Sequence, residues 1–102
     1  MPSSIQRKLA AIMFTDIAGY TAFSAKDENK ALELLDKQKQ ILTPIIIEYN
    51  GTLHNKIDDG RLFAFPTVTD AVRCGIKIQK ETKAVKDLNL LIAISIIPYG
   101  KK

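Results

Sequence analysis

Apolar residues recur at helical spacing in the middle of the chain, and charged residues occupy positions between them. This pattern predicts an amphipathic helix with one face in the core and the other in water. Asp27 or Ser24 can cap a helix that begins near Glu28, because both side chains accept hydrogen bonds from first-turn amides. The apolar positions of this stripe are Leu32, Leu34, Leu35, Ile41, Leu42, Ile45, Ile46 and Tyr49.

Proline and glycine mark how this helix ends and where the next begins. Pro44 lies inside the stripe and predicts a kink, or a break with a second short helix starting there. The pair Asn50-Gly51 is typical of a left-handed helix end. Farther along, Thr67 or Thr69 can cap another helix. Its apolar positions are Ala71, Val72, Cys74, Ile76 and Ile78.

Four further runs have the composition of strands. Residues 9–14 and 90–97 are uninterrupted apolar runs that indicate buried strands, the second ending at Pro98. Residues 52–57 alternate between polar and apolar side chains, and residues 61–65 are apolar and aromatic. The intervening Asp58-Asp59-Gly60 predicts a hairpin turn.

The predicted order is strand, helix, strand, strand, helix, strand. We therefore expect an α+β fold of ferredoxin-like βαββαβ type, an antiparallel sheet with two helices on one face. The strands are apolar on both faces, yet two helices cover only one. We expect association through the uncovered face, as a homodimer or higher oligomer.

Composition narrows the class of protein. A chain of 102 residues with 46% hydrophobic and 25% charged residues fits one compact globular domain. The net charge of +4 comes from lysines interleaved with acidic residues, which indicates solvated helix faces and no nucleic-acid surface. No apolar run is long enough for a membrane span or signal peptide, so we expect a cytoplasmic protein without a membrane partner. The single cysteine, Cys74, is interpreted as a packed side chain.

The candidate chemistry lies where the first strand ends. Asp16 would stand at its carboxyl end, and Gly19 can adopt backbone angles that turn successive amides toward an anion. In the expected topology Asp59 of the hairpin turn approaches Asp16, and two carboxylates suit hard divalent cations. The alternative is that Asp16 is a strand terminator and Asp59 a turn residue.

Several segments resemble, in order, the amino-terminal part of the class III adenylate/guanylate cyclase catalytic domain. The resemblance spans most of the chain and includes two separated motifs with the expected elements between them. The matching residues are Arg7-Lys8-Leu9-Ala10-Ala11-Ile12-Met13-Phe14-Thr15-Asp16-Ile17-Ala18-Gly19-Tyr20-Thr21, Asn50-Gly51-Thr52, Lys56-Ile57-Asp58-Asp59-Gly60-Arg61-Leu62-Phe63-Ala64-Phe65-Pro66 and Asp70-Ala71-Val72-Arg73-Cys74.

The resemblance implies a two-metal site. Asp16 and Asp59 would bind two Mg²⁺ or Mn²⁺ ions with the carbonyl of Ile17, and the amides of Ala18, Gly19, Tyr20 and Thr21 would hold the phosphates of ATP or GTP. The family converts a nucleoside triphosphate to its 3′,5′-cyclic monophosphate and pyrophosphate, at sites formed between two domains.

The chain also departs from the family pattern. Asp58 stands where the family usually has glycine, and Asn55 takes the base-selecting position that is commonly lysine in adenylyl cyclases. Lys56 should point to the opposite face of the strand. The carboxyl-terminal segment that supplies the base-contacting aspartate and the transition-state asparagine and arginine has no counterpart here.

We therefore expect residues 7–98 to form a truncated nucleotidyl cyclase-like domain, with residues 1–6 a flexible amino terminus and residues 99–102 a tail. Such a domain would be inactive alone, so whether this chain is an enzyme stays open. The alternative function is a non-catalytic association module, with or without metal-nucleotide binding.

Other residues have two interpretations each. His54 is a surface residue or a general base, and the former is favoured. Tyr20 and Phe23 are core cover or base-stacking groups, with core cover favoured. Arg61 and Arg73 are solvated or paired side chains, or phosphate contacts.

Overall fold

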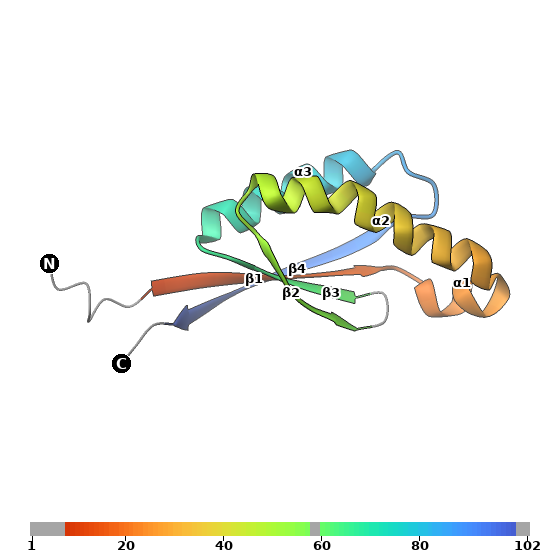
Figure 1. The fold of residues 1–102 in the computed structure, drawn as a ribbon, viewed down its shortest axis with the longest axis horizontal. Helices are drawn as coiled ribbons and strands as arrows, with labels where there is room; N and C mark the ends of the chain where they lie inside the picture. Colours follow the sequence, from red (N-terminus) through yellow and green to blue (C-terminus); the bar gives the residue numbers. More distant parts are fainter. Residues whose placement is uncertain (1–7, 58–59, 100–102) are drawn as a thin grey trace, which may run out of the picture.

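The computed structural model describes residues 8–57 and 60–99 as an α+β fold, with one antiparallel sheet and helices on one side of it (Figure 1). The expected fold class is confirmed. The expected flexible amino terminus and most of the expected tail lie outside the described residues. The elements in chain order are β1 (Lys8–Ile17), α1 (Tyr20–Lys26), α2 (Glu28–Glu48), β2 (Thr52–Ile57), β3 (Gly60–Phe65), α3 (Val68–Thr82) and β4 (Leu90–Tyr99).

The sheet has the strand order β2-β3-β1-β4, so β1 is flanked by a strand on each side. β1 pairs with β4 without interruption from Lys8↔Tyr99 to Ile17↔Leu90. The fourth strand therefore continues past Pro98, where the sequence pattern predicted its end. Proline is tolerated there because β4 is an edge strand and its missing amide is not needed by a central ladder.

α2 is continuous through Pro44, so the predicted break does not occur. Pro44 has no amide hydrogen to donate to the backbone carbonyl one turn earlier in the helix. Pro44 is exposed, so water can donate to that carbonyl instead. The helix starts as expected, since Asp27 Oδ1 accepts a hydrogen bond from the Lys30 amide at 3.1 Å. Asn50 takes the left-handed conformation predicted for the end, with φ of 67°.

The seven-residue helix α1 was not predicted from the sequence pattern. Gly19 precedes it without a side-chain cap, so the usual start signal is missing. Asp27 ends α1 and also begins α2, and its strong capping signal hides the shorter helix in the sequence.

The core lies between the sheet and the two long helices. β1 contributes Ala11, Met13 and Ile17 from its helix-facing side, and the remaining strands and helices pack apolar side chains against them. α3 is capped by Thr67, whose Oγ1 accepts from the Asp70 amide at 3.0 Å. The buried residues of α3 are Ala71, Cys74, Gly75, Ile78 and Thr82.

Two positions of the predicted α3 stripe, Val72 and Ile76, are exposed instead of buried. Both side chains line a cavity between α3 and β4, so they are not covered by the sheet. Leu32 of the predicted α2 stripe is likewise exposed, whereas the polar Gln38 is buried.

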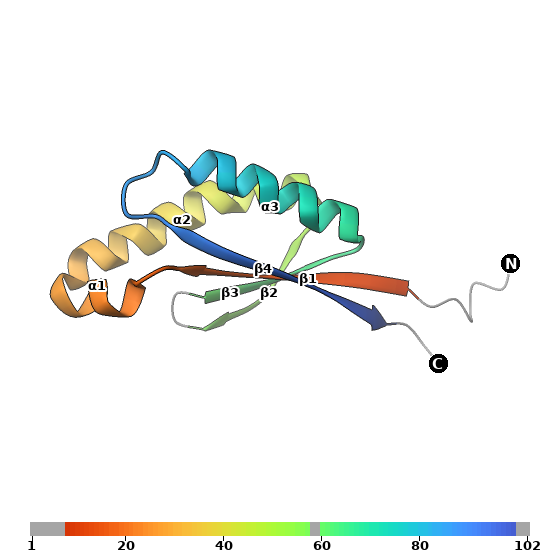
Figure 2. The same ribbon diagram turned by 180° about the vertical axis from the view of Figure 1, so that it is seen from behind.

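All three helices leave one face of the sheet uncovered (Figures 1 and 2). This open face carries side chains that alternate with the buried ones on each strand. Phe14 of β1 and Leu91 of β4 are exposed on it, and Leu62 and Ala64 of β3 are half-buried. The expected apolar uncovered face is thus present.

Candidate functional site

Asp16 is the penultimate residue of β1 and lies at the carboxyl end of a strand inside the sheet. Its neighbours Thr15 and Ile17 are buried on the helix side, so strand alternation places Asp16 on the open face. It pairs in register with Leu91 of β4 and is half-buried. The carboxylate therefore stands at a fixed strand end with access from the open side.

The hairpin between β2 and β3 reaches the same end of the sheet. The last β1–β3 pair is Thr15↔Arg61, and one residue further along each strand come Asp16 and Gly60. The β2–β3 ladder closes at Ile57↔Gly60. Asp59, the second predicted metal ligand, and its neighbour Asp58 lie outside the described residues. The strand register therefore places Asp16 beside the residue that follows Asp59 in the sequence.

The turn after β1 has the backbone geometry that the sequence predicted. Gly19 is left-handed, with φ of 73° and ψ of 13°, and Tyr20 and Thr21 begin α1 directly after it. The first amides of a helix have no acceptor within the helix, so they are donors for another group. The left-handed glycine lets the chain turn sharply from the strand into this helix.

The amide of Ala18 is engaged within the protein. It donates to the Asn89 carbonyl at 2.7 Å, which extends the β1–β4 pairing by one step beyond Ile17↔Leu90. Of the four predicted phosphate-binding amides, this one has an internal acceptor. This contact could not be predicted from the sequence, because Asn89 belongs to the loop after α3, far from Ala18 in the chain.

The predicted base-selecting residue, Asn55, lies on β2 opposite Leu62, directly after a β-bulge at residues 53–55. Its neighbour Lys56 pairs with Arg61, which is buried on the helix side of the sheet. Lys56 and Arg61 both line a cavity of about 290 Å³ beneath α2. Lys56 therefore lies on the helix side of the sheet, as Arg61 does.

The surroundings of the other residues considered in the sequence analysis bear on their two interpretations. Burial raises the pKa of the Cys74 thiol to about 12, with smaller contributions from the nearby Glu48 and Asp70 charges. This confirms a packed, unreactive side chain. Tyr20 packs against the core, which favours its interpretation as core cover, and His54 and Arg73 are exposed.

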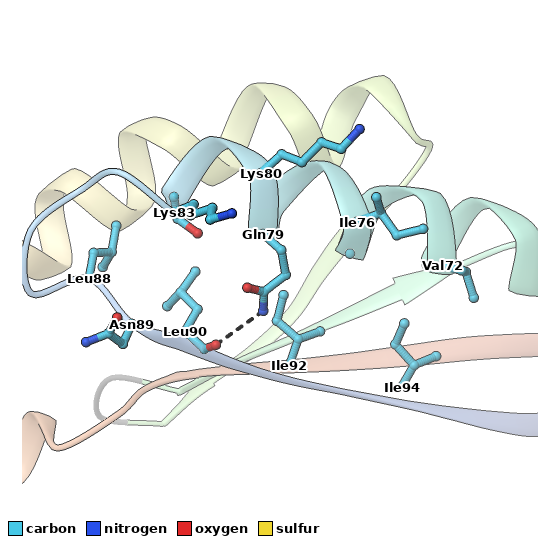
Figure 3. A pocket seen from close by; sticks show the side chains of 12 residues that line it. Val72, Ile76, Gln79, Lys80, Lys83, Leu88, Asn89, Leu90, Ile92 and Ile94 are labelled. Atoms are coloured by element: carbon cyan, nitrogen blue, oxygen red, sulfur yellow. Dashed lines mark hydrogen bonds between the residues drawn. The ribbon is translucent and has the colours of Figure 1, made fainter.

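A larger cavity, of about 700 Å³, lies between α3 and β4 on the helix side of the sheet (Figure 3). Gln79 Nε2 donates to the Leu90 carbonyl across it at 3.3 Å. No residue of the stretch 14–21 lines this cavity, so it is separate from the Asp16 end on the open face.

The described residues contain neither a large cluster of metal-ligating side chains nor a membrane-spanning helix. Over residues 8–57 and 60–99, no group of three or more His, Cys, Asp or Glu side chains is placed to hold a metal ion. The ligands predicted from the sequence are two aspartates and a backbone carbonyl, which is fewer than three such side chains. In the same described part of the chain, none of the helices combines the length and apolar character needed to cross a bilayer.

Comparisons with known proteins bear on the whole chain. No family model matches it. A putative adenylate cyclase 3 from Rhizobium meliloti (strain 1021) is 33% identical over 82 residues, which cover 79% of this chain and 14% of the relative. The serine/threonine-protein kinase pkn2 of Myxococcus xanthus is 28% identical over 78 residues, 76% of this chain and 9% of that protein.

Solved structures share the arrangement of elements. A bacterial light-regulated adenylyl cyclase matches with a TM-score of 0.81 and 24% identity, over 91% of this chain and 55% of the other. An adenylate/guanylate cyclase/hydrolase from Silicibacter pomeroyi matches with a TM-score of 0.76 and 27% identity, over 91% and 59% of the two chains. The chain is a class III adenylate/guanylate cyclase-like domain.

Two more distant structures share the fold of this cyclase-like domain. The guanylate cyclase domain from Catenaria anguillulae, solved in complex with GTP, has a TM-score of 0.78 at 19% identity, over 91% of this chain and 59% of that chain. The dimeric guanylyl cyclase domain from Blastocladiella emersonii has a TM-score of 0.77 at 18% identity, over 91% and 60%. The cyclase-like domain spans 55% to 60% of these four solved chains.

Proposed function

We propose that this cyclase-like domain carries the metal and triphosphate half of a nucleotidyl cyclase site and does not turn over nucleotide by itself. The observation that carries the proposal is the strand end itself. Asp16 is followed by a left-handed Gly19 that turns directly into the first amides of α1. A carboxylate beside the first amides of a helix suits a metal-bound polyphosphate.

The proposed metal ligands are Asp16, Asp59 and the carbonyl of Ile17, which together would hold two Mg²⁺ or Mn²⁺ ions. Two facts support this. The donor set consists of oxygen atoms, which both cations prefer. The strand register brings Asp16 level with Gly60, the residue after Asp59. When bound, such ions neutralise charge on the phosphates and lower the pKa of the attacking 3′-hydroxyl.

The proposed phosphate contacts are the amides of Gly19, Tyr20 and Thr21. The amide of Ala18 joins them only if its hydrogen bond to Asn89 opens. Asn55 stands at the proposed base-selecting position. A carboxamide both donates and accepts, so it suits either ATP or GTP.

Incomplete coverage of the solved cyclases supports the absence of turnover. The chain matches 55% to 60% of their length, which fits the expectation from the resemblance that the base-contacting and transition-state residues belong to a part of the family's domain not matched here. We further propose a homodimer or higher oligomer and a cytoplasmic location, where nucleoside triphosphates and Mg²⁺ are available. The second candidate, a non-catalytic association module, is favoured by the apolar open face around Phe14 and Leu91.

The test measures nucleotide binding and turnover in parallel. Isothermal titration of ATP and of GTP in Mn²⁺ is expected to show binding that disappears with Asp16→Asn and with Asp59→Asn. Asp36→Asn, on the exposed face of α2, is the matched control and should bind normally. No cyclic nucleotide should form above background in any of the four proteins.

Two results would contradict the proposal. Binding that survives both aspartate substitutions, or that never occurs, would leave the association module as the function. Cyclic nucleotide formation that Asp16→Ala abolishes would show that the domain is an active enzyme on its own.

A further inference from the structure

The two edges of the sheet differ in how they are protected against pairing with another strand. β2 has six residues, a β-bulge, and the polar or charged side chains of His54 and Lys56. Short length, bulges and charges are the usual means by which an edge strand is kept from pairing. The β2 edge is therefore protected against pairing with another strand.

β4 has none of these three features, and proline, which also protects edge strands, occurs in it only near its end, at Pro98. It has ten residues, pairs with β1 without a bulge, and carries no charged residue from Leu90 to Tyr99. In the described part of the chain, no strand lies on its outer side. Its isoleucine-rich, uncharged sequence has high β-propensity, so the outer amides and carbonyls of β4 are a template for another strand.

Exposed apolar side chains extend from this edge onto α3. On the helix side of β4, Ile94 and Ile96 are 36% and 54% exposed, and Val72 and Ile76 of α3 are 42% and 54% exposed. Val72, Ile76 and Ile94 line the 700 Å³ cavity between the two elements. The edge and the cavity therefore form one apolar surface, which we call the β4 surface.

Charge is distributed unevenly along the β4 surface. Lys83 and Asn89 lie at the Leu90 end of the strand, the Lys80 side chain points away from the strand, and Val72 and Ile76 lie toward Ile94 (Figure 3). An antiparallel partner of the same sequence brings two apolar ends together. Lys83 of one copy and Lys83 of the other then lie at opposite ends of the contact, where they do not repel each other.

We propose that two copies of this chain associate by antiparallel pairing of their β4 strands, with Ser95 close to the two-fold axis. In this register Ile94 of each copy lies opposite Ile96 of the other, on the helix side of one continuous sheet. The contact is isologous and closed, as expected for a two-fold dimer. It uses the edge of the sheet and leaves the open face with Asp16 untouched.

Sedimentation velocity over a concentration series tests the pairing. Ile96→Lys places an ammonium group on each side of the axis in an apolar contact, so the dissociation constant should rise at least about tenfold. Thr52→Lys is the matched control, since it adds the same charge to an exposed position of the opposite edge strand, and it should dimerise like the wild type. Circular dichroism confirms that each variant folds.

Cross-linking tests the register independently of affinity. A short bis-maleimide should join two copies of Ser95→Cys, because residues opposite each other in an antiparallel pair lie about 5 Å apart. Thr52→Cys should remain uncoupled, and the buried Cys74 should not react.

Three results would overturn the proposal: a monomeric wild-type protein, dimerisation that Ile96→Lys leaves unchanged, or association that only Phe14→Lys on the open face abolishes. The last result would support the assembly suggested under the proposed function and refute the β4 contact alone.

Discussion

Gln38 is a polar residue in the apolar stripe of α2, and replacing it should stabilise the protein. Its side chain is 0% exposed, and within residues 8–57 and 60–99 neither Nε2 nor Oε1 has a hydrogen-bond partner. It shares the buried side of the helix with Leu42 and Ile45. Gln38→Met keeps the length and flexibility of the side chain and removes both polar groups.

The size of the effect follows from the cost of burying an unpaired polar group. That cost is about 1–3 kcal/mol per group, so Gln38→Met should raise the free energy of unfolding by about 2 kcal/mol. For a domain of this size, the gain corresponds to roughly 8 °C or more in Tm. Urea denaturation followed by circular dichroism measures it directly, and an unchanged m value would show that the unfolded state is not altered.

Gln40→Met is the matched control on the same helix. The Gln40 amide is exposed and donates to Asp36 at 2.9 Å, so its loss should change the stability by less than about 0.5 kcal/mol. Equal stability of Gln38→Met and wild type, or a loss, would refute the reasoning. It would show that the Gln38 amide is hydrogen-bonded in solution.

Three further predictions concern the core. Gly75→Ala should stabilise α3 by about 0.5–1 kcal/mol, because alanine favours the helix and the added Cβ would lie at an ordinary 3.5 Å from Met13. Gly51→Ala should destabilise instead, since the same atom would lie 2.6 Å from the Phe65 ring, and equal effects in thermal melts would contradict this. In the folded protein, burial raises the pKa of Cys74 from 9.0 to about 12. Below pH 9 the folded and unfolded states both keep the thiol neutral, so the full stability of the fold is present there. As the pH rises above 9 only the unfolded chain ionises, so the unfolding free energy should fall by up to about 1.4 kcal/mol per pH unit, a slope that Cys74→Ala should lack.

The sequence predicted those parts of the fold in which local signals agree with tertiary packing. Asp27, Thr67 and Asn50 act at the helix ends where their side-chain and backbone preferences place them. Pro44 is different. Its local preference for a break is overridden, because α2 has buried residues both before and after Pro44. Such an override depends on tertiary contacts, which the hydrophobic periodicity of the sequence does not reveal.

The candidate site was predictable only in part for the same reason. Asp16 and Gly19 are adjacent in sequence, so their strand end and turn follow from local chemistry. The hydrogen bond from Ala18 to Asn89 joins loops far apart in the chain, and only the register of β1 against β4 produces it. The exposure of Ile76 also depends on how α3 lies over β4, where the two elements leave the cavity that Ile76 lines.

The pairing of β1 with β4 also bears on how this protein folds. β1 is the first element and β4 the last, and Ile17 and Leu90 meet across roughly seventy intervening residues. Pairing strands so far apart requires a large loop to close before the contact stabilises anything, which slows folding. During synthesis, the strand that carries Asp16 therefore lacks one of its two neighbours until β4 has emerged. The geometry of the candidate site is consequently one of the last features of this fold to become fixed.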